Sequence, residues 1–353
     1  MANFQIKLTP VETFFFGGEK HSINTSGEPV SDYFSESSLY PQQTTLLGLT
    51  RYLLLIKNDT IFKKNKIIDK AKASEYIGES SFDFSNQASG YGKIRTISSL
   101  YFTYGEENYF FAPLDYGSNL LENFVLEKEI DNEIEEYTAK EKNKFLQQIV
   151  VSNSFHAKMI EDIVKSSPMV GNEKAENGTS KEDAFYKQNM KYLAAGWSFA
   201  FDSEIEEDAG ISDIDELFVP FGGEKCYFKV EISKKPKAEP TVPTNYRRNQ
   251  FTVILLSDSF LVDTSLLNKS DFAINDFVSF RNLQSTVGTT QKYSGLSNRD
   301  PVQLKRSSRY NLLKRGSVLY FNNKENFDEV KTAIGSNKNL TNIGFNHILT
   351  INK

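Results

Sequence analysis

Residues 216–232 read ELFVPFGGEKCYFKVEI, and the alternation in this stretch predicts a β-strand with one buried face. The apolar positions are Cys226, Phe228, Val230 and Ile232, and the positions between them are Lys225, Tyr227, Lys229 and Glu231. The pentapeptide FGGEK, residues 221–225 of this stretch, also occurs at residues 16–20. There are three explanations for this repeat: two halves of one site, relics of a duplicated domain, or coincidence. The sequence around each copy has to distinguish between them.

The segments around the two copies follow the order strand, helix, hairpin, helix, strand. The predicted ranges are 4–8 for the first strand, 41–58 for the first helix, 184–204 for a hairpin that breaks at Gly196, 211–218 for the second helix and 225–232 for the last strand. This βαββαβ order is that of a ferredoxin-like fold, which belongs to the α+β class.

A large insertion, roughly residues 58–180, interrupts this first unit. It contains probable strands at 93–102 and 108–114 and a charged segment at 121–145 that is expected to be an exposed helix. Residues 166–183 are rich in Gly, Ser, Asn and charge, which is typical of a flexible loop.

A second, smaller domain is expected after a proline-rich linker. The predicted boundaries are an N-terminal domain at 1–236, a linker at 237–248 and a C-terminal domain at 249–353. The last part contains strands at 251–256 and 317–321, a helix at 324–334 and a strand at 342–351. This order predicts a second ferredoxin-like unit in degenerate form.

Composition excludes several classes of site. The chain of 353 residues has one cysteine, Cys226, and three dispersed histidines, so neither an intramolecular disulfide nor a cysteine-rich zinc site is expected. Neither glycine pair completes a P-loop, and no dinucleotide-binding fingerprint is present, so no cofactor is predicted. Without a signal peptide or a membrane-spanning apolar run, the expected location is the cytoplasm.

Charge is unevenly distributed around a net value of −5. Residues 281–315 carry eight cations and one anion, Asp300, whereas residues 202–216 carry eight acids and no cation. The cations are Arg281, Lys292, Arg299, Lys305, Arg306, Arg309, Lys314 and Arg315. Such runs are either solvated faces or binding surfaces. As binding surfaces, the basic run would suit a polyanion and the acidic run a protein partner.

The predicted fold brings the two FGGEK copies together, because the first and last strands of a ferredoxin-like sheet are antiparallel neighbours. One copy follows the first strand and the other precedes the last strand. Glycine pairs allow backbone N–H groups to turn towards an anion, and a helix N-terminus favours negative charge. The resulting phosphate cradle would consist of Gly17, Gly18, Lys20, Gly222, Gly223 and Lys225, with Gln42, Gln43, Thr44 and Thr45 at the helix start. The alternatives are two tight turns and an N-cap of the helix.

Several motifs resemble one family of CRISPR-associated proteins. They are LTPVETFFFGGE (8–19), LYPQQTTLLGLTRYLLL (39–55), IGESSF (77–82), ISSLYF (97–102), FFAPLD (110–115), the run from VGNEK to GWSFAF (170–201), LFVPFGGEK (217–225) and LLKRGSVLYF (312–321). Together they resemble the third subunit of the Cmr (type III-B) effector complex, a member of the RAMP superfamily of RNA-binding proteins. PQQTTLLG and GWSFAF discriminate best, and the match covers most of the chain.

The resemblance implies two packed, RRM-related ferredoxin-like domains and a role without catalysis. Members of this family cap the 5′ end of the CRISPR RNA (crRNA) by holding its repeat-derived tag. They are expected to lie beside the large polymerase-like subunit and the backbone RAMP subunits of the complex. Single-stranded RNA binding of this kind combines phosphate contacts from loops with bases that splay onto side chains.

Further residues follow as candidates for contact with that RNA. Lys20 and His21 lie in the first glycine segment, and Arg51 lies on the first helix. Lys187 and Lys191 lie on the predicted hairpin, which in related proteins reaches over the RNA. The basic candidates of the second domain are Arg306, Arg309, Lys314 and Arg315.

Two other functions remain open at the level of sequence. A metal-independent RNA endonuclease that processes repeat RNA, as found among RAMP relatives, would use a side chain such as His21 as general acid or base. A scaffold that binds only proteins would use the acidic run and would show no affinity for RNA.

Overall fold

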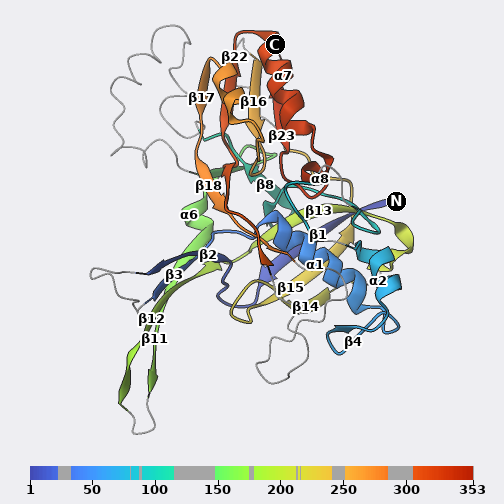
Figure 1. Ribbon diagram of the computed structural model, residues 1–353, viewed down its shortest axis with the longest axis vertical. Helices are drawn as coiled ribbons and strands as arrows, with labels where there is room; N and C mark the ends of the chain where they lie inside the picture. The colour runs from blue at the N-terminus through green and yellow to red at the C-terminus, as the bar shows by residue number, and fades with distance from the viewer. Residues whose placement is uncertain are drawn as a thin grey trace.

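The computed structural model describes residues 1–22, 33–79, 81–86, 90–114, 148–174, 179–211, 214, 216–240, 251–284 and 305–352. Its elements form an α+β arrangement that is rich in strand, which confirms the predicted class. Figure 1 shows a large sheet with α1 (Gln43–Ile56) against it, and a smaller sheet with α7 (Lys324–Gly335) near the C-terminus. No helix in the described ranges is long and apolar enough to cross a membrane.

The large sheet has nine strands and contains the predicted first and last strands of the first unit. Eight of them lie in the order β10 (Ala157–Met159), β9 (Ile149–Ser152), β8 (Glu107–Phe111), β7 (Tyr101–Tyr104), β13 (Trp197–Ile205), β1 (Ala2–Pro10), β15 (Tyr227–Lys234) and β14 (Glu216–Pro220), and β6 (Ile94–Ile97) also pairs with β13. β1 and β15 are antiparallel neighbours, in register from Phe4 opposite Lys234 to Pro10 opposite Phe228. The predicted pairing of these two strands is therefore confirmed.

One face of this sheet is apolar and packs against α1. Along β1, the alternate residues Phe4, Ile6 and Leu8 are buried in the same core as the leucines of α1. The strands contribute an aromatic cluster to that core, in which Phe14, Phe16, Phe199, Phe221 and Phe228 lie within 5.0–6.1 Å of one another, ring centre to ring centre. Each fully buried phenylalanine or leucine contributes about 1.5–3 kcal/mol, so the aromatic excess of the sequence serves mainly this core.

The opposite face of the sheet is polar, and the chain itself crosses it. After β15, the segment from Lys235 to Pro240 leaves the sheet edge and runs over Gln5 and Asp202. The Lys235 ammonium donates to Gln5 Oε1 at 3.3 Å, and the Ala238 N–H donates to Asp202 Oδ2 at 3.0 Å. The start of the predicted linker is thus fixed to the first domain, and residues 241–248 of it lie outside the described residues.

A second sheet projects from the body as a long hairpin. Its order is β11 (Val164–Lys174), β12 (Ser180–Leu193), β3 (Tyr33–Ser37) and β2 (Gly17–Ser22), and Figure 1 shows β11 and β12 extending away from the main sheet. The prediction of a flexible loop at 166–183 was wrong, because β11 and β12 pair from Val164 opposite Leu193 onwards. The strands were missed because the described residues of the hairpin beyond its base are largely exposed and show no apolar alternation.

The predicted hairpin at 184–204 was also wrong in its pairing. Gly196 does mark a turn, with φ +82°, between two strands. However, β12 pairs with β11 and β3, whereas β13 pairs with β1, β6 and β7. The strand beside β13 is therefore β7, which lies inside the segment that we had assigned to an insertion.

The predicted second helix at 211–218 was wrong over residues 216–218, which belong to a strand, and residues 212, 213 and 215 lie outside the described residues. Edge strand β14 begins at Glu216 and pairs with β15, and helical turns precede it at η2 (Glu207–Ala209) and at Ile211. The pairing with β15 buries Val219 in the core and packs the half-buried Leu217 against it, which outweighs the weak helix signal of this short stretch. The predicted helix at 121–145 lies outside the described residues.

The C-terminal sheet has the order β17 (Phe272–Ile274), β22 (Val318–Phe321), β16 (Phe251–Leu255) and β23 (Ile348–Ile351), and all its pairs are antiparallel. α7 covers it with Phe327, Val330 and Ile334, and the Asn323 side chain caps the helix by accepting from the Glu325 N–H at 2.8 Å. The strands predicted at 251–256 and 317–321 and the helix predicted at 324–334 are confirmed. The strand predicted at 342–351 is formed only over Ile348–Ile351, because a turn that follows α8 (Lys338–Thr341) occupies residues 342–347.

Short elements complete the fold and join its two parts. They are β4 (Phe62–Lys63), β5 (Lys66–Ile67), α2 (Lys70–Ile77), α6 (Ile160–Ile163), η4 (Thr264–Lys269), β18 (Phe277–Phe280), β19 (Leu283–Gln284), β20 (Lys305–Arg306), β21 (Tyr310–Leu313) and α8 (Lys338–Thr341). Phe84, from the first part, packs against Phe260, Phe280, Tyr310 and Phe345 of the second, with ring centres 4.6–5.4 Å apart. The two parts therefore share an aromatic core.

Candidate nucleic-acid interface

The second FGGEK copy forms the tight loop between β14 and β15. The loop is closed at its base by the Phe221 N–H, which donates to Cys226 O at 2.9 Å. Gly222 has φ +87°, and Glu224 and Lys225 adopt left-handed backbone angles of +55° and +57°. Such angles cost a non-glycine residue about 1–2 kcal/mol, so the surrounding structure must hold them in place.

The two copies lie next to each other, as the fold prediction required. The Gly223 N–H donates to Phe15 O at 2.7 Å, and the rings of Phe16 and Phe221 lie 5.4 Å apart. A Cβ atom on Gly222 would lie 2.7 Å from Phe15 O and 3.1 Å from the Phe16 ring. The second glycine pair therefore allows a close backbone approach, and the Gly223 N–H is already used in it.

The first copy is not a loop, which corrects the expectation of two glycine loops. From Gly17 it forms edge strand β2, in which Gly17 lies opposite Ser37 and Lys20 opposite Ser35, with an irregularity between these two pairs. His21 lies opposite Phe34. Gly18 belongs to the irregular stretch, and the side chains of Lys20 and His21 lie outside the described part of the structure.

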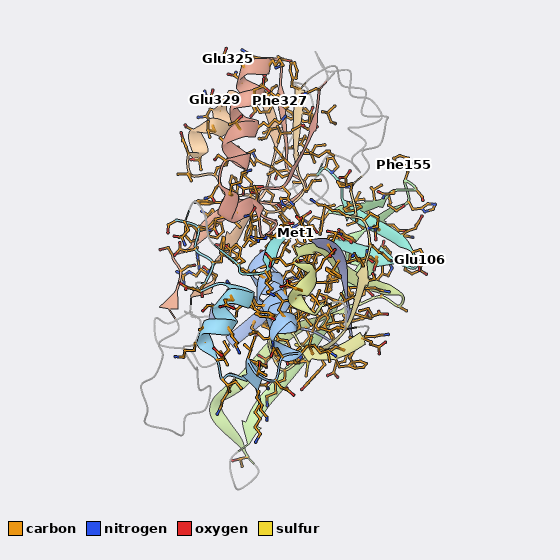
Figure 2. The ribbon with its side chains drawn as sticks, turned by 90° about the vertical axis from the view of Figure 1, so that its right-hand side faces the viewer. Met1, Glu106, Phe155, Glu325, Phe327 and Glu329 are labelled. Atoms are coloured by element: carbon orange, nitrogen blue, oxygen red, sulfur yellow. The ribbon has the colours of Figure 1, made fainter. Side chains whose placement is uncertain are left out.

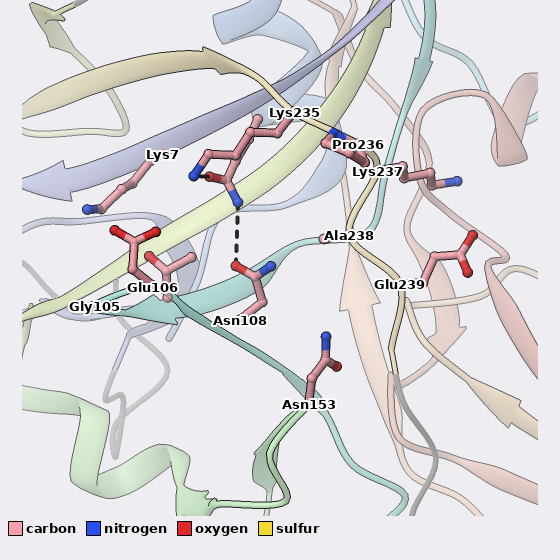
Figure 3. Close-up of a pocket in the computed structure, with 12 residues that line it drawn as sticks. Lys7, Gly105, Glu106, Asn108, Asn153, Lys235, Pro236, Lys237, Ala238 and Glu239 are labelled. Carbon is pink, nitrogen blue, oxygen red and sulfur yellow. Dashed lines mark hydrogen bonds between the residues drawn. The ribbon is translucent and has the colours of Figure 1, made fainter.

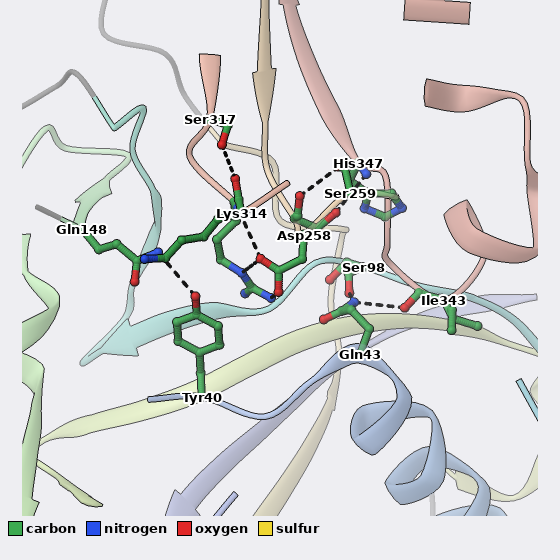
Figure 4. Close-up of polar contacts among 12 residues, drawn as sticks. Tyr40, Gln43, Ser98, Gln148, Asp258, Ser259, Lys314, Ser317, Ile343 and His347 are labelled. Carbon is green, nitrogen blue, oxygen red and sulfur yellow. Dashed lines mark hydrogen bonds and ion pairs between the residues drawn. The ribbon is translucent and has the colours of Figure 1, made fainter. Parts of the chain in front are cut away.

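The start of α1 serves the fold more than an exposed surface. Gln43 is fully buried and donates from Nε2 to Ser98 O at 2.8 Å and to Ile343 O at 3.0 Å, as Figure 4 shows. This burial favours a structural role for Gln43 over a contact with RNA. Gln42 occupies the N-cap without a side-chain capping bond and is half-buried, as are Thr44 and Thr45.

Arg51 lies further along α1 and is half-buried. Its guanidinium lies 5.4 Å from the centre of the Tyr91 ring, and burial lowers the pKa of Arg51 to about 10. This position favours a packing role for Arg51 over an exposed contact with RNA.

The two lysines of the hairpin have different surroundings. Lys187 is exposed on β12, with its ammonium 5.9 Å from the centre of the Phe34 ring. Lys191 is buried and donates to Glu36 Oε1 at 3.0 Å and to Ser166 Oγ at 2.9 Å. Lys187 is thus the accessible cation of the pair.

The basic segment of the second domain divides in the same way. Arg281 and Arg309 are exposed, whereas Lys314 forms an ion pair with Asp276 at 3.2 Å. The backbone of Arg306 forms part of β20, and its side chain lies outside the described part, as do Lys292 and Arg299.

Arg315 is fully buried, so its predicted role as a surface cation is wrong. Its Nε and Nη2 donate to the two carboxylate oxygens of Asp258, each at 3.2 Å. The guanidinium also lies 4.2 Å from the centre of the Tyr40 ring and 4.8 Å from that of Phe111. Because Tyr40 and Phe111 belong to the first part of the chain, Arg315 joins the two parts. No sequence signal separates it from the exposed arginines around it.

The acidic run is largely neutralised by cations of the same chain. Asp208 pairs with Lys93 at 2.8 Å, Glu207 pairs with Lys234 at 3.3 Å, and Glu206 pairs with Arg95. Asp202 is buried, and burial raises the pKa of its carboxyl group. Residues 213 and 215 lie outside the described part. The described acids therefore give less support to an acidic docking surface than the sequence suggested.

Two exposed aromatic residues flank the glycine loop and were not among the predicted site residues. Phe218 on β14 and Tyr227 on β15 are 57% and 49% exposed. Phe218 lies opposite Lys229, and Pro220 lies opposite Tyr227, so both aromatic side chains are on the polar face of the sheet. The sequence does indicate their exposure. In ELFVP and CYFKV, both aromatic residues stand at the alternate positions that point away from the core.

Two of the three histidines can be placed, and neither is next to the glycine loop. His156 Nδ1 lies 3.2 Å from the Glu107 carboxylate in an exposed pair. His347 Nε2 lies 2.8 Å from Thr341 O, and burial lowers the pKa of this imidazole. The described residues contain no group of three or more His, Cys, Asp or Glu side chains placed to hold a metal ion.

The comparison with protein families decides the assignment. The family described as CRISPR-associated protein (Cas_Cmr3) matches residues 134–353, which is more than half of the chain. The chain belongs to the Cmr3 family. The resemblance drawn from the sequence motifs is thereby confirmed, and the match also spans the second glycine loop and the whole C-terminal sheet.

Solved structures of similar fold support the same architecture. The chain is similar to a chain of a cryo-EM structure of the Type III-B Cmr-beta bound to cognate target RNA, with a TM-score of 0.51 and 15% identity. The alignment covers 98% of this chain and 96% of that chain. A second structure of Cmr-beta, with cognate target RNA and AMPPnP, gives a TM-score of 0.52 at the same identity. No curated protein sequence matches the chain significantly.

Proposed function

We propose that this Cmr3-family protein is a non-catalytic RNA-binding subunit of a type III-B CRISPR effector complex. In that complex it caps and holds the 5′ repeat-derived tag of the crRNA and docks against the large polymerase-like subunit. Membership of the family, together with the contact between the two FGGEK copies, carries the proposal. The similar Cmr-beta structures, which contain target RNA, support it at the level of the fold.

The strand orders support a ferredoxin-like organisation of both parts. In the first part, β15, β1, β13 and β7 lie side by side, which is the 4-1-3-2 order when they are numbered along the chain. In the second part, β23, β16, β22 and β17 have the same 4-1-3-2 order. The second helix of the first unit and the first helix of the second unit are reduced to η2 and η4. We infer two ferredoxin-like units, each with one full helix, α1 or α7.

The glycine loop offers a place for one or two phosphates. Within the described structure, the Lys225 side chain and the N–H groups of Glu224 and Lys225 have no hydrogen-bond partner. Exposed backbone N–H groups beside an ammonium suit an anion. The bases of the same strand would lie on the exposed rings of Phe218 and Tyr227, since stacking on aromatic side chains is the usual mode for single strands.

The cations that remain accessible are further candidates for contact with the RNA. Lys187 on the hairpin and Arg281 and Arg309 in the second part are exposed, unlike Lys191 and Arg315. We assign the backbone contacts of the tag to Lys225 and to this accessible set. The affinity should then fall with salt, as it does for every protein that neutralises phosphates.

The proposal is tested by purifying the tagged protein from its native host and sequencing the 5′ ends of the bound RNA. The expected reads begin with one common, repeat-derived tag. These reads should be lost in a Lys20→Glu, Lys225→Glu double variant and kept in Lys63→Glu, since Lys63 is an exposed lysine on β4, which carries neither FGGEK copy. Bound RNA without a shared 5′ end, or no bound RNA, would contradict the proposal.

A further inference from the structure

A cavity lies on the polar face of the main sheet, at the other end of β15 from the glycine loop. It has a volume of about 480 Å³ and is lined by β1, by the turn between β7 and β8, and by the segment after β15. Figure 3 shows the chain from Lys235 to Glu239 passing beside the strand of Asn108, so the cavity lies between this segment and the sheet and is open to solvent on one side. Its size is within the range of small-molecule sites.

The floor of the cavity is made of buried polar side chains. Gln5 is 8% exposed and donates from Nε2 to Tyr101 Oη at 2.9 Å and to Asn108 Oδ1 at 3.4 Å. Thr103 is 4% exposed, and its Oγ1 has no hydrogen-bond partner among the described residues. A buried hydroxyl without a partner costs about 1–3 kcal/mol, so a ligand that bonds to it would recover that cost.

The rim of the cavity is charged, with an excess of lysine. Lys7, Lys235 and Lys237 contribute ammonium groups, and Glu106 and Glu239 contribute carboxylates. Lys7 is held only loosely, by Glu231 at 3.8 Å, and the Lys235 ammonium bonds to the neutral Gln5 amide. Glu106 lies on the exposed β7–β8 turn at the edge of the molecule, as does Phe155 on the neighbouring turn (Figure 2). Lys7 and Lys235 are therefore available to an anion.

We propose that this cavity binds a ribose-phosphate unit, with the phosphate at Lys7 and Lys235 and a ribose hydroxyl at Thr103. Ammonium groups suit the phosphate, whereas a threonine hydroxyl and amide side chains suit the hydroxyls of a sugar. No aromatic residue belongs to the described lining, so the cavity offers no ring on which a base would stack. The sugar and phosphate, and not the base, are the recognised parts. Such a unit comes from a free ribonucleotide or from a nucleotide of an RNA strand.

The experiment measures binding to the purified full-length protein by isothermal titration calorimetry. The probes are ribose 5-phosphate, AMP and a short oligoribonucleotide with a 5′ phosphate. Ribose 5-phosphate and AMP are expected to bind with similar affinity, because the base is not recognised. Competition by the oligonucleotide assigns the site to RNA, and binding of the small probes alone assigns it to a free ribonucleotide.

Three variants separate the site from the fold. Lys235→Met should weaken the binding of ribose 5-phosphate about tenfold, whereas Lys234→Met removes the same charge one residue away and should leave it unchanged. Thr103→Val should weaken binding about fivefold without lowering the melting temperature, because valine removes the unpartnered hydroxyl at constant volume. Absence of binding by all probes, equal effects of the two lysine variants, or unchanged binding in Thr103→Val would overturn the proposal.

Discussion

The two FGGEK copies have the same five residues and different structures. Phe221–Lys225 makes a tight loop in which three of the five residues, Gly222, Glu224 and Lys225, have left-handed backbone angles. From Gly17, the other copy runs as an edge strand along β3. The second copy is closed between β14 and β15, whereas the first is paired with β3. The comparison teaches that the strands to which a short motif is attached determine its conformation.

Arginines in the basic segment differ in the same way. Arg309 is exposed, and Arg315, six residues later, is fully buried against Asp258, Tyr40 and Phe111. A cluster of like residues in a sequence can therefore combine a candidate binding surface with a structural ion pair. The predictions below compare members of each pair, from the largest expected effect to the smallest.

The largest difference is expected between the two arginines. Arg315→Met should lower the free energy of unfolding by about 3–5 kcal/mol, because it leaves the Asp258 carboxylate buried without its partner. Arg309→Met should change it by no more than about 0.5 kcal/mol. Urea denaturation of both variants measures the difference. A double variant, Arg315→Met with Asp258→Leu, should recover part of the loss, and equal stability of the two single variants would refute the buried pair.

The glycines of the two copies should differ next. Gly222→Ala should cost about 2–4 kcal/mol, because alanine at φ +87° is strained and its Cβ would lie 2.7 Å from Phe15 O. Gly17→Ala meets nothing within 4 Å and should stay within about 0.5 kcal/mol of the parent protein. Thermal unfolding compares the two variants. If Gly17→Ala were the more damaging change, the packing of the second loop against Phe15 would not be the main constraint.

The smallest effect on stability is expected for two exposed lysines, Lys187 on the hairpin and Lys225 in the glycine loop. Lys187→Ala and Lys225→Ala should leave the melting temperature unchanged within error, since neither side chain is buried. Each should reduce the slope of log affinity for tag RNA against log salt by about 0.7, the value for one lost contact with a single strand. Titrations at several salt concentrations provide this slope. A slope equal to that of the parent protein would remove the residue concerned from the RNA surface.

Much of the main sheet could be predicted from the sequence, because its strands bury one face. The apolar patterns in residues 4–8 and 225–232 located β1 and β15, and the ferredoxin-like order of the elements predicted their antiparallel pairing. The leucines of 41–58 located α1 in the same way. From these elements followed the contact between the two glycine segments.

The parts that failed have a common physical reason. The β11–β12 hairpin projects from the body and buries side chains only at its base, where Val164, Met190 and Lys191 lie, so the described residues further out look like a loop in the sequence. Three polar residues are buried against partners that are distant in sequence. Gln43 donates to the carbonyl of Ile343, Lys191 pairs with Glu36, and Arg315 pairs with Asp258. A polar residue gives no sequence signal of such burial, since its own type predicts exposure.

The most direct test of the central claim is a photo-cross-link from the second glycine loop. The photoreactive residue p-benzoylphenylalanine replaces Lys225 in the protein as it is assembled in its native host, and the same replacement at Lys63 serves as the control. The cross-linked nucleotide is then mapped by sequencing. The account predicts that position 225 cross-links to the repeat-derived tag at the 5′ end of the crRNA and that position 63 does not. Cross-links from position 225 that reach only protein, or nucleotides spread along the guide, would contradict it.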